Sequence, residues 1–79
     1  MIDLRELVQY EYMETPVRVV CDDGQVIIGL PDAVDDEEES GLGEPGITLA
    51  TEDGGIVGIG ISEIKAISPV AAAQKAVAI

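Results

Sequence analysis

Two glycines five residues apart, Gly24 and Gly29, constrain this chain strongly because they interrupt an apolar stretch rich in β-branched residues. Val17–Cys21 alternates as a strand does, and the Asp-Asp-Gly at residues 22–24 supplies the left-handed residue of a hairpin turn. Residues 25–30 return as a second strand that contains Gly29. A glycine inside a strand lowers its stability and usually marks a bulge or a sharp bend at a barrel corner. The pattern therefore predicts a strongly bent antiparallel hairpin.

An amphipathic helix is predicted ahead of the hairpin, within residues 2–14. Leu4, Leu7 and Val8 recur at helical spacing, and Asp3 can cap the first turn. The pattern ends at Thr15-Pro16 because a proline restricts the residue before it.

Three short strands are expected downstream, over residues 47–51, 56–61 and 64–68. In the second of them, Gly58 and Gly60 leave one face nearly bare, which fits either strong curvature or the close approach of another backbone. An acidic loop over residues 31–46 separates the hairpin from these strands. It carries seven acids and no base, so it buries too little apolar surface to offset its ordering entropy, and we expect it to be mobile.

Length and composition limit how such a chain is stabilised. Its 79 residues make a single domain, and a domain of this size buries only about 60 to 65% of the surface that it exposes when unfolded. Cys21 is the only cysteine and histidine is absent, so neither an internal disulfide nor the usual zinc site is available. Oligomerisation is the remaining way to add stability. Residues 69–79 form an apolar tail, for which a short C-terminal helix and a frayed end remain alternatives.

Charge and hydropathy disfavour several partners. Sixteen acids against four bases give a net charge of −12, which repels a phosphate backbone and disfavours plain nucleic-acid binding. No apolar run reaches the roughly 18 residues of a membrane span, and the N-terminus lacks the basic flank and apolar core of a signal peptide. We therefore expect a cytoplasmic protein that does not bind a membrane.

The chain offers few groups for catalysis. The commonest general base, histidine, is absent, and Cys21 lies in a strand followed by acids, which raise the pKa of a thiol. We interpret Cys21 as a structural cysteine. The acidic run at residues 32–39 lacks the ligand spacing of a calcium loop, so we interpret it as a solvated loop. The sequence predicts no enzyme, no cofactor and no metal site.

The order of these elements resembles the Sm-like family, in particular its short bacterial members that open with Leu-Arg-Glu-Leu and close on Ser-Glu-Ile-Lys. The hydrophobic alternation, the Asp-Gly pair and the later glycine match the first family motif at Asp23, Gly24 and Gly29. The apolar positions of the second motif match Ile59, Ile64 and Ile67. The resemblance implies a mainly β fold, in which an N-terminal α-helix precedes a five-stranded, strongly bent antiparallel SH3-like barrel over residues 17–68.

Departures from the family pattern fall on its RNA pocket. In RNA-binding members, the first motif continues into a base-stacking side chain and an asparagine that reads the base, and the second motif carries an arginine. The corresponding positions in this chain are Asp35, Glu37, Glu39 and Gly60. They provide neither the aromatic face nor the cationic groove that single-stranded nucleic acid requires. The resemblance therefore implies that the pocket is lost.

Family members associate as rings because the fourth strand of one subunit pairs with the fifth strand of the next. In a monomer these strands are apolar edges, which are an aggregation hazard unless they are paired. We therefore expect a homo-oligomeric ring whose interface includes Ile56, Val57, Ile59, Ile61, Ile64 and Ile67.

Two functions follow from the resemblance. The first is a non-catalytic assembly module that binds protein partners, with the acidic loop attracting a basic protein. The alternative is an RNA-binding protein of RNA metabolism that uses another face of the ring. Salt-sensitive binding of a single-stranded oligonucleotide distinguishes the second function from the first.

Overall fold

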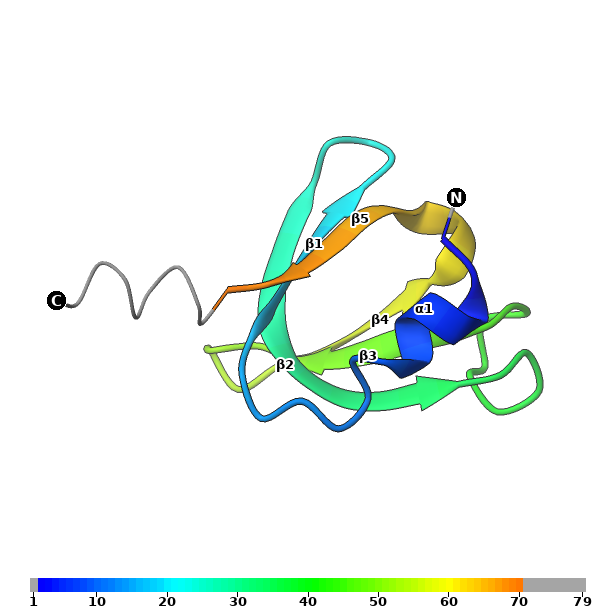
Figure 1. The fold of residues 1–79 in the computed structure, drawn as a ribbon, viewed down its shortest axis with the longest axis horizontal. Coiled ribbons are helices and arrows are strands. Elements are labelled where there is room, and N and C mark those ends of the chain that lie inside the picture. Colours follow the sequence, from blue (N-terminus) through cyan, green and yellow to red (C-terminus); the bar gives the residue numbers. More distant parts are fainter. Residues whose placement is uncertain (1, 71–79) are drawn as a thin grey trace, which may run out of the picture.

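The computed structural model describes residues 2–70 of the chain (Figure 1). Within this range the fold is mainly β, with one small helix and a five-stranded antiparallel sheet. The elements in chain order are α1 (Leu4–Val8), β1 (Val17–Cys21), β2 (Val26–Asp35), β3 (Gly46–Ala50), β4 (Ile56–Gly60), a 3₁₀ turn η1 (Ile61–Glu63) and β5 (Ile64–Pro69). No helix of this part of the chain has the length and apolar character needed to cross a bilayer.

The sheet has the strand order β4-β3-β2-β1-β5, and β2 is the strand on which it bends. The first half of β2 pairs with β1, ending at the pair Val17 and Gly29, whereas its second half pairs with β3 from Leu30 and Ala50 onward. The predicted bend at Gly29 is therefore confirmed. The predicted barrel is not closed, because no pairing joins β4 to β5 within residues 2–70.

Gly29 is required at the bend for a steric reason. A Cβ atom there would lie 2.7 Å from the carbonyl oxygen of Ala50 and 3.1 Å from Cβ of Leu49. Any side chain would push β3 away from the corner. Gly24 has a different role, since its φ of 90° supplies the left-handed residue of the β1–β2 turn, as predicted.

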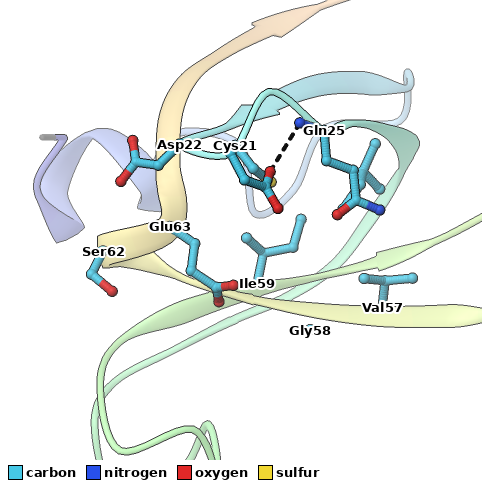
Figure 2. A pocket seen from close by; sticks show the side chains of 10 residues that line it. Cys21, Asp22, Gln25, Val57, Gly58, Ile59, Ser62 and Glu63 are labelled. Atoms are coloured by element: carbon cyan, nitrogen blue, oxygen red, sulfur yellow. Dashed lines mark hydrogen bonds between the residues drawn. The ribbon is translucent and has the colours of Figure 1, made fainter.

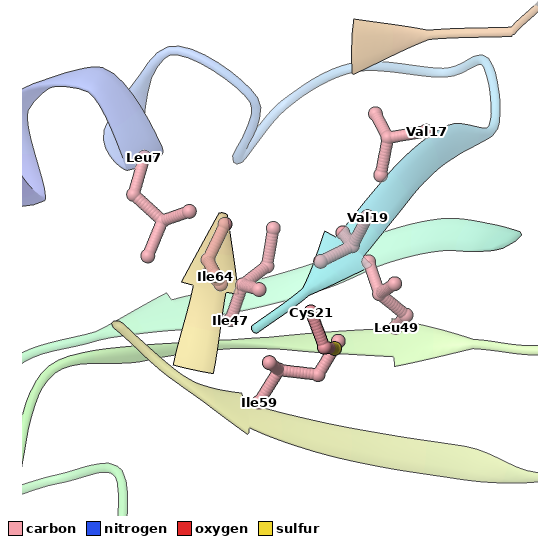
Figure 3. Close-up of a cluster of buried hydrophobic side chains, with 8 residues drawn as sticks. All are labelled: Leu7, Val17, Val19, Cys21, Ile47, Leu49, Ile59 and Ile64. Carbon is pink, nitrogen blue, oxygen red and sulfur yellow. The ribbon is translucent and has the colours of Figure 1, made fainter. Parts of the chain in front are cut away.

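The core lies inside the bend of the sheet (Figure 3). Its members come from α1 and from every strand except β2, and they are Leu7, Val17, Val19, Cys21, Ile47, Leu49, Ile59 and Ile64. No polar side chain among residues 2–70 is buried with them. Leu7 is the one fully buried residue of α1, so the helix is held mainly by this single contact with the core.

The helix is shorter than the predicted segment of residues 2–14, because it ends at Val8. Beyond this point the backbone turns with i to i+3 hydrogen bonds, such as those from Tyr10 N to Leu7 O and from Glu11 N to Val8 O. Val8 is 45% exposed and Tyr12 is 86% exposed, whereas Tyr10 and Met13 pack against the core from the turns that follow the helix. A helix this short is stabilised by packing and not by propensity.

The acidic loop is also shorter than predicted, because residues 31–35 belong to β2. Pro31 is tolerated within the strand at a register shift, which lies between Pro31 and Ala33. The loop therefore covers residues 36–45, and the remaining strands agree with the predicted bounds within one or two residues. Most of the predicted C-terminal helix or tail, from residue 71 onward, lies outside the described residues.

Candidate functional site

The two ends of the sheet, at β4 and β5, are its free edges within residues 2–70. Hydrogen bonds from Thr51 N to Gly55 O and from Ile61 N to Pro45 O, both 2.8 Å, show which β4 residues face β3. Paired and unpaired backbone groups alternate along an antiparallel ladder. The backbone N–H and C=O groups of Ile56, Gly58 and Gly60 therefore point away from β3, toward the free edge.

The β4 edge is partly capped by the chain itself. The Gly60 N–H donates a hydrogen bond to the Glu63 carboxylate at 3.0 Å. Ile56 and Gly58 have no strand partner on this side among the described residues, and the Ile56 side chain is 69% exposed. The edge therefore offers main-chain groups for one more strand, with an exposed apolar side chain beside them.

The β5 edge presents fewer donors. The hydrogen bond from Val70 N to Pro16 O, 3.0 Å, and the ladder with β1 direct the backbone groups of Ile67 and Pro69 toward the free side. Pro69 has no N–H to donate. The Ile67 carbonyl accepts a hydrogen bond from the Tyr10 hydroxyl at 3.3 Å. Pairing at this edge is thus restricted to a short stretch around Ile67.

The structure divides the six residues expected at an oligomer interface into three groups. Ile56 is exposed at the β4 edge. Val57, Ile61 and Ile67 are half-buried and pack against the core of the same protomer. Ile59 and Ile64 are fully inside that core, so their side chains are not available to a partner. Alternate strand residues point inward, and an apolar pattern alone does not distinguish a core position from an interface position.

The positions matched to the family's RNA pocket converge only in part. The register pairs Asp35 with Gly46 and Gly46 with Gly60, so Asp35 and Gly60 lie at the same end of three adjacent strands. Glu37 and Glu39 are instead exposed in a turn after β2. In this turn the Asp36 carboxylate accepts a hydrogen bond from the Glu39 N–H at 3.0 Å.

Glu44, which the sequence analysis did not single out, covers Gly60. Its carboxylate accepts hydrogen bonds from the Ser62 N–H at 2.9 Å and from the Ser62 hydroxyl at 2.7 Å. A Cβ atom at Gly60 would clash with this carboxylate. The position that carries an arginine in the family therefore has a carboxylate over it, and no sequence spacing predicts this approach of the loop to η1.

Hydrogen bonds within the acidic loop define the path of its backbone in the structure. The Ser40 hydroxyl donates to the Glu44 carbonyl at 2.6 Å and accepts from the Leu42 N–H at 3.0 Å. Gly41 and Gly43 both have positive φ, which allows the tight path between these bonds. The loop thus presents Glu44 to Ser62 from an internally hydrogen-bonded frame.

A cleft of about 340 Å³ lies where the sheet is open, between the β1–β2 hairpin and β4 (Figure 2). Cys21, Asp23, Gly58 and Glu63 are among its lining residues. Burial raises the pKa of the Cys21 thiol, and the charges of Asp23, Glu63 and Asp22 raise it further. The thiolate is therefore disfavoured, which makes this cysteine a poor nucleophile.

The cleft has one free strand edge and an acidic border, since Gly58 belongs to β4 and Glu63 to η1. Among the residues that the structure describes, no three side chains of the His, Cys, Asp and Glu types are placed to hold a metal ion. Comparisons of the chain with protein-family models, with curated proteins and with solved structures found no match. We therefore base the functional proposal on the two free edges and on the acidic surface near Gly60.

Proposed function

We propose that this chain is an Sm-like, non-catalytic assembly module that forms a homo-oligomeric ring and binds protein partners. One observation carries the proposal: the strand order β4-β3-β2-β1-β5 leaves β4 and β5 as the free ends of a strongly bent sheet. These are the fourth and fifth strands, the pair through which family members join. The Gly24 turn and the Gly29 corner support the same resemblance.

The two edges are chemically different, which favours a head-to-tail contact. The β4 edge offers the backbone of Ile56 and Gly58, whereas the β5 edge offers that of Ile67. Addition of a strand to a sheet edge gains main-chain hydrogen bonds, each worth about 0.5–1.5 kcal/mol net. A contact between unlike surfaces generates a ring when its rotation closes. Pairing of β4 with β5 of the next copy would also cover Ile56.

The distribution of charge supports protein partners in preference to RNA. The chain has a net charge of −12, and the loop over residues 36–45 adds its acids beside the Glu44 carboxylate that covers Gly60. A surface of this sign attracts basic protein and repels phosphate. The ring would repeat the acidic surface once in each subunit, and this repetition strengthens its attraction for a basic partner.

Native mass spectrometry and light scattering at micromolar concentration test the assembly. We expect one defined multiple of the 8.3 kDa chain for the unmodified protein. Ile56→Lys places a charge on the free β4 edge and should shift the population to monomer. Val26→Lys is the matched control, since Val26 is an apolar strand residue that is 44% exposed but lies away from both edges. A monomeric unmodified chain would refute the proposal.

The binding part of the proposal has its own test. Fluorescence anisotropy with oligouridine and oligoadenosine at low salt should show no saturable binding, whereas a basic peptide such as oligolysine should bind and be released as salt rises. Saturable, salt-sensitive binding of either oligonucleotide would support the alternative role in RNA metabolism instead.

A further inference from the structure

An apolar groove of about 470 Å³ lies beside the Gly29 corner. Its apolar walls come from the residue before β1, the middle of β2, the end of β3 and the residue after β5, and they are Pro16, Ile28, Leu30, Ala50 and Val70. Ile28 is 49% exposed and Leu30 is 44% exposed. Adjacent apolar side chains with this much exposure favour a covering partner.

The chain itself leads into this groove. Val70 forms part of the wall, and its N–H donates a hydrogen bond to the Pro16 carbonyl at 3.0 Å. The end of β5 lies on the same side of the molecule as the β3–β4 turn, which contributes Thr51 and Glu52 to the lining (Figure 1). The described part of the chain therefore ends in the wall of the groove.

The composition of residues 71–79 suits the groove. The segment contains five alanines, one valine and one isoleucine, and its only charge is Lys75. The only charged residue that lines the groove is Glu52. An apolar segment with a single positive charge thus adjoins an apolar groove with a single negative charge, in a chain that is otherwise strongly acidic.

We propose that residues 71–79 cover this groove on the same chain, with their apolar side chains against Ile28, Leu30 and Ala50. The tether at Val70 gives the segment a high effective concentration at the groove, and the loop that must be closed is short. Nine residues span about 13 Å as a helix and up to about 30 Å when extended, so the groove is within reach in either form. This inference does not depend on the ring proposed above.

A spin label on the full-length chain tests the contact. Ala78→Cys provides a thiol for a nitroxide, while Cys21 is buried with a raised thiol pKa and should stay unmodified, which mass spectrometry checks. We expect the amide signals of Ile28 and Ala50 to be broader in the sample with the paramagnetic nitroxide than in the same sample after the nitroxide has been reduced. The broadening should fall several-fold in Leu30→Asp, which places a charge in the groove.

The control separates docking from simple tethering. Val26→Asp changes an exposed residue of the same strand outside the groove and should leave the broadening unchanged. Equal broadening in Leu30→Asp and in the otherwise unmodified labelled chain would overturn the proposal, since a tethered but undocked segment behaves in this way. The unlabelled variant Val77→Asp provides a second measurement. Its substitution lies in residues 71–79, and loss of docking should still shift the amide signals of the groove.

Mixing distinguishes the segment's own groove from that of a neighbour. A sample is prepared from ¹⁵N-enriched chains without the nitroxide and unenriched chains that carry it. We expect little broadening at Ile28 and Ala50 in this sample. Broadening as strong as in the uniformly labelled sample would mean that the segment covers the groove of a second copy, and it would overturn the intramolecular proposal.

Discussion

The Tyr10 hydroxyl donates a hydrogen bond to the Ile67 carbonyl at 3.3 Å and so ties the turn after α1 to the free side of β5. Tyr10 also packs against the core with the other half-buried apolar residues. A carbonyl oxygen has two lone pairs, so this contact still leaves one for a neighbouring strand. The N-terminal segment can therefore hold the β5 edge in place and leave it competent to pair.

Tyr10→Phe removes this hydrogen bond while it keeps the aromatic ring in place. We expect the free energy of unfolding to fall by about 0.5–1.5 kcal/mol, because one hydrogen bond is lost. Urea denaturation at a fixed protein concentration measures the change. Tyr12→Phe is the control, since Tyr12 is 86% exposed, and it should have an effect close to zero. Equal effects of the two exchanges would show that the Tyr10 contact contributes nothing to stability.

Two glycine substitutions in the sheet should have opposite consequences. Gly29→Ala would place a Cβ atom 2.7 Å from the Ala50 carbonyl oxygen, and overpacking of this kind typically costs about 1–3 kcal/mol. Gly58→Ala would place its Cβ 3.9 Å from Leu42, an ordinary contact, and should be neutral or slightly stabilising. Thermal and urea unfolding of both variants provide the measurement. A tolerated alanine at position 29 would contradict the steric origin of the bend.

The same Gly58 variant addresses the two explanations of the glycines in β4. Curvature of the strand and close approach of another backbone both explain them from sequence. If Gly58→Ala keeps its stability and its oligomeric mass, the site does not require a neighbour in direct contact with its Cα. Loss of assembly with unchanged monomer stability would instead indicate such an approach.

Several features could be predicted from the sequence because local conformation decides them. The Asp-Gly turn needs a left-handed residue, which Gly24 supplies. Short alternating runs located all five strands. At these positions a few residues adjacent in the sequence determine the local structure.

The remaining features depend on contacts between distant parts of the chain. The helix ends at Val8, and Leu7 is its one buried residue, which helical spacing cannot show. Residues 31–35 have a loop-like composition, but they pair with β3 and therefore extend β2. The contact between Glu44 and Ser62 joins residues 18 positions apart through the fold. Each of these errors reflects a non-local contact that overrides a local preference.

Glu44→Gln tests the link between the acidic loop and η1. The neutral amide has one acceptor oxygen in place of two and makes weaker hydrogen bonds than a carboxylate, so we expect a loss of about 1 kcal/mol at this contact. Hydrogen exchange of the Ser62 amide should become about five-fold faster or more. Glu37→Gln removes the same charge from an exposed position in the same loop and should leave this exchange unchanged. Similar acceleration by both variants would assign the effect to net charge instead of the contact.

The β3–β4 turn should respond to acid through Asp53. The hydrogen bond from the Thr51 hydroxyl and the one from the Gly55 N–H, 3.0 Å, hold the pKa of the Asp53 carboxyl below its ordinary value of about 3.9. A carboxyl with a lowered folded-state pKa stabilises the fold fully above its unfolded-state pKa, and this contribution is lost as the pH falls through the folded-state pKa. Carbonyl ¹³C shifts of Asp53, followed from pH 6 to pH 2, report the titration directly.

Thr51→Val removes the larger of these causes and keeps the shape of the side chain. We expect the pKa of Asp53 to rise toward its ordinary value while the Gly55 hydrogen bond remains. The acid-dependent loss of stability should then be complete at a higher pH and be smaller in total. Because Asp53 is exposed, the difference should appear in the local titration before it appears in global unfolding. An unchanged Asp53 titration in Thr51→Val would show that the threonine hydroxyl does not stabilise the ionised carboxylate.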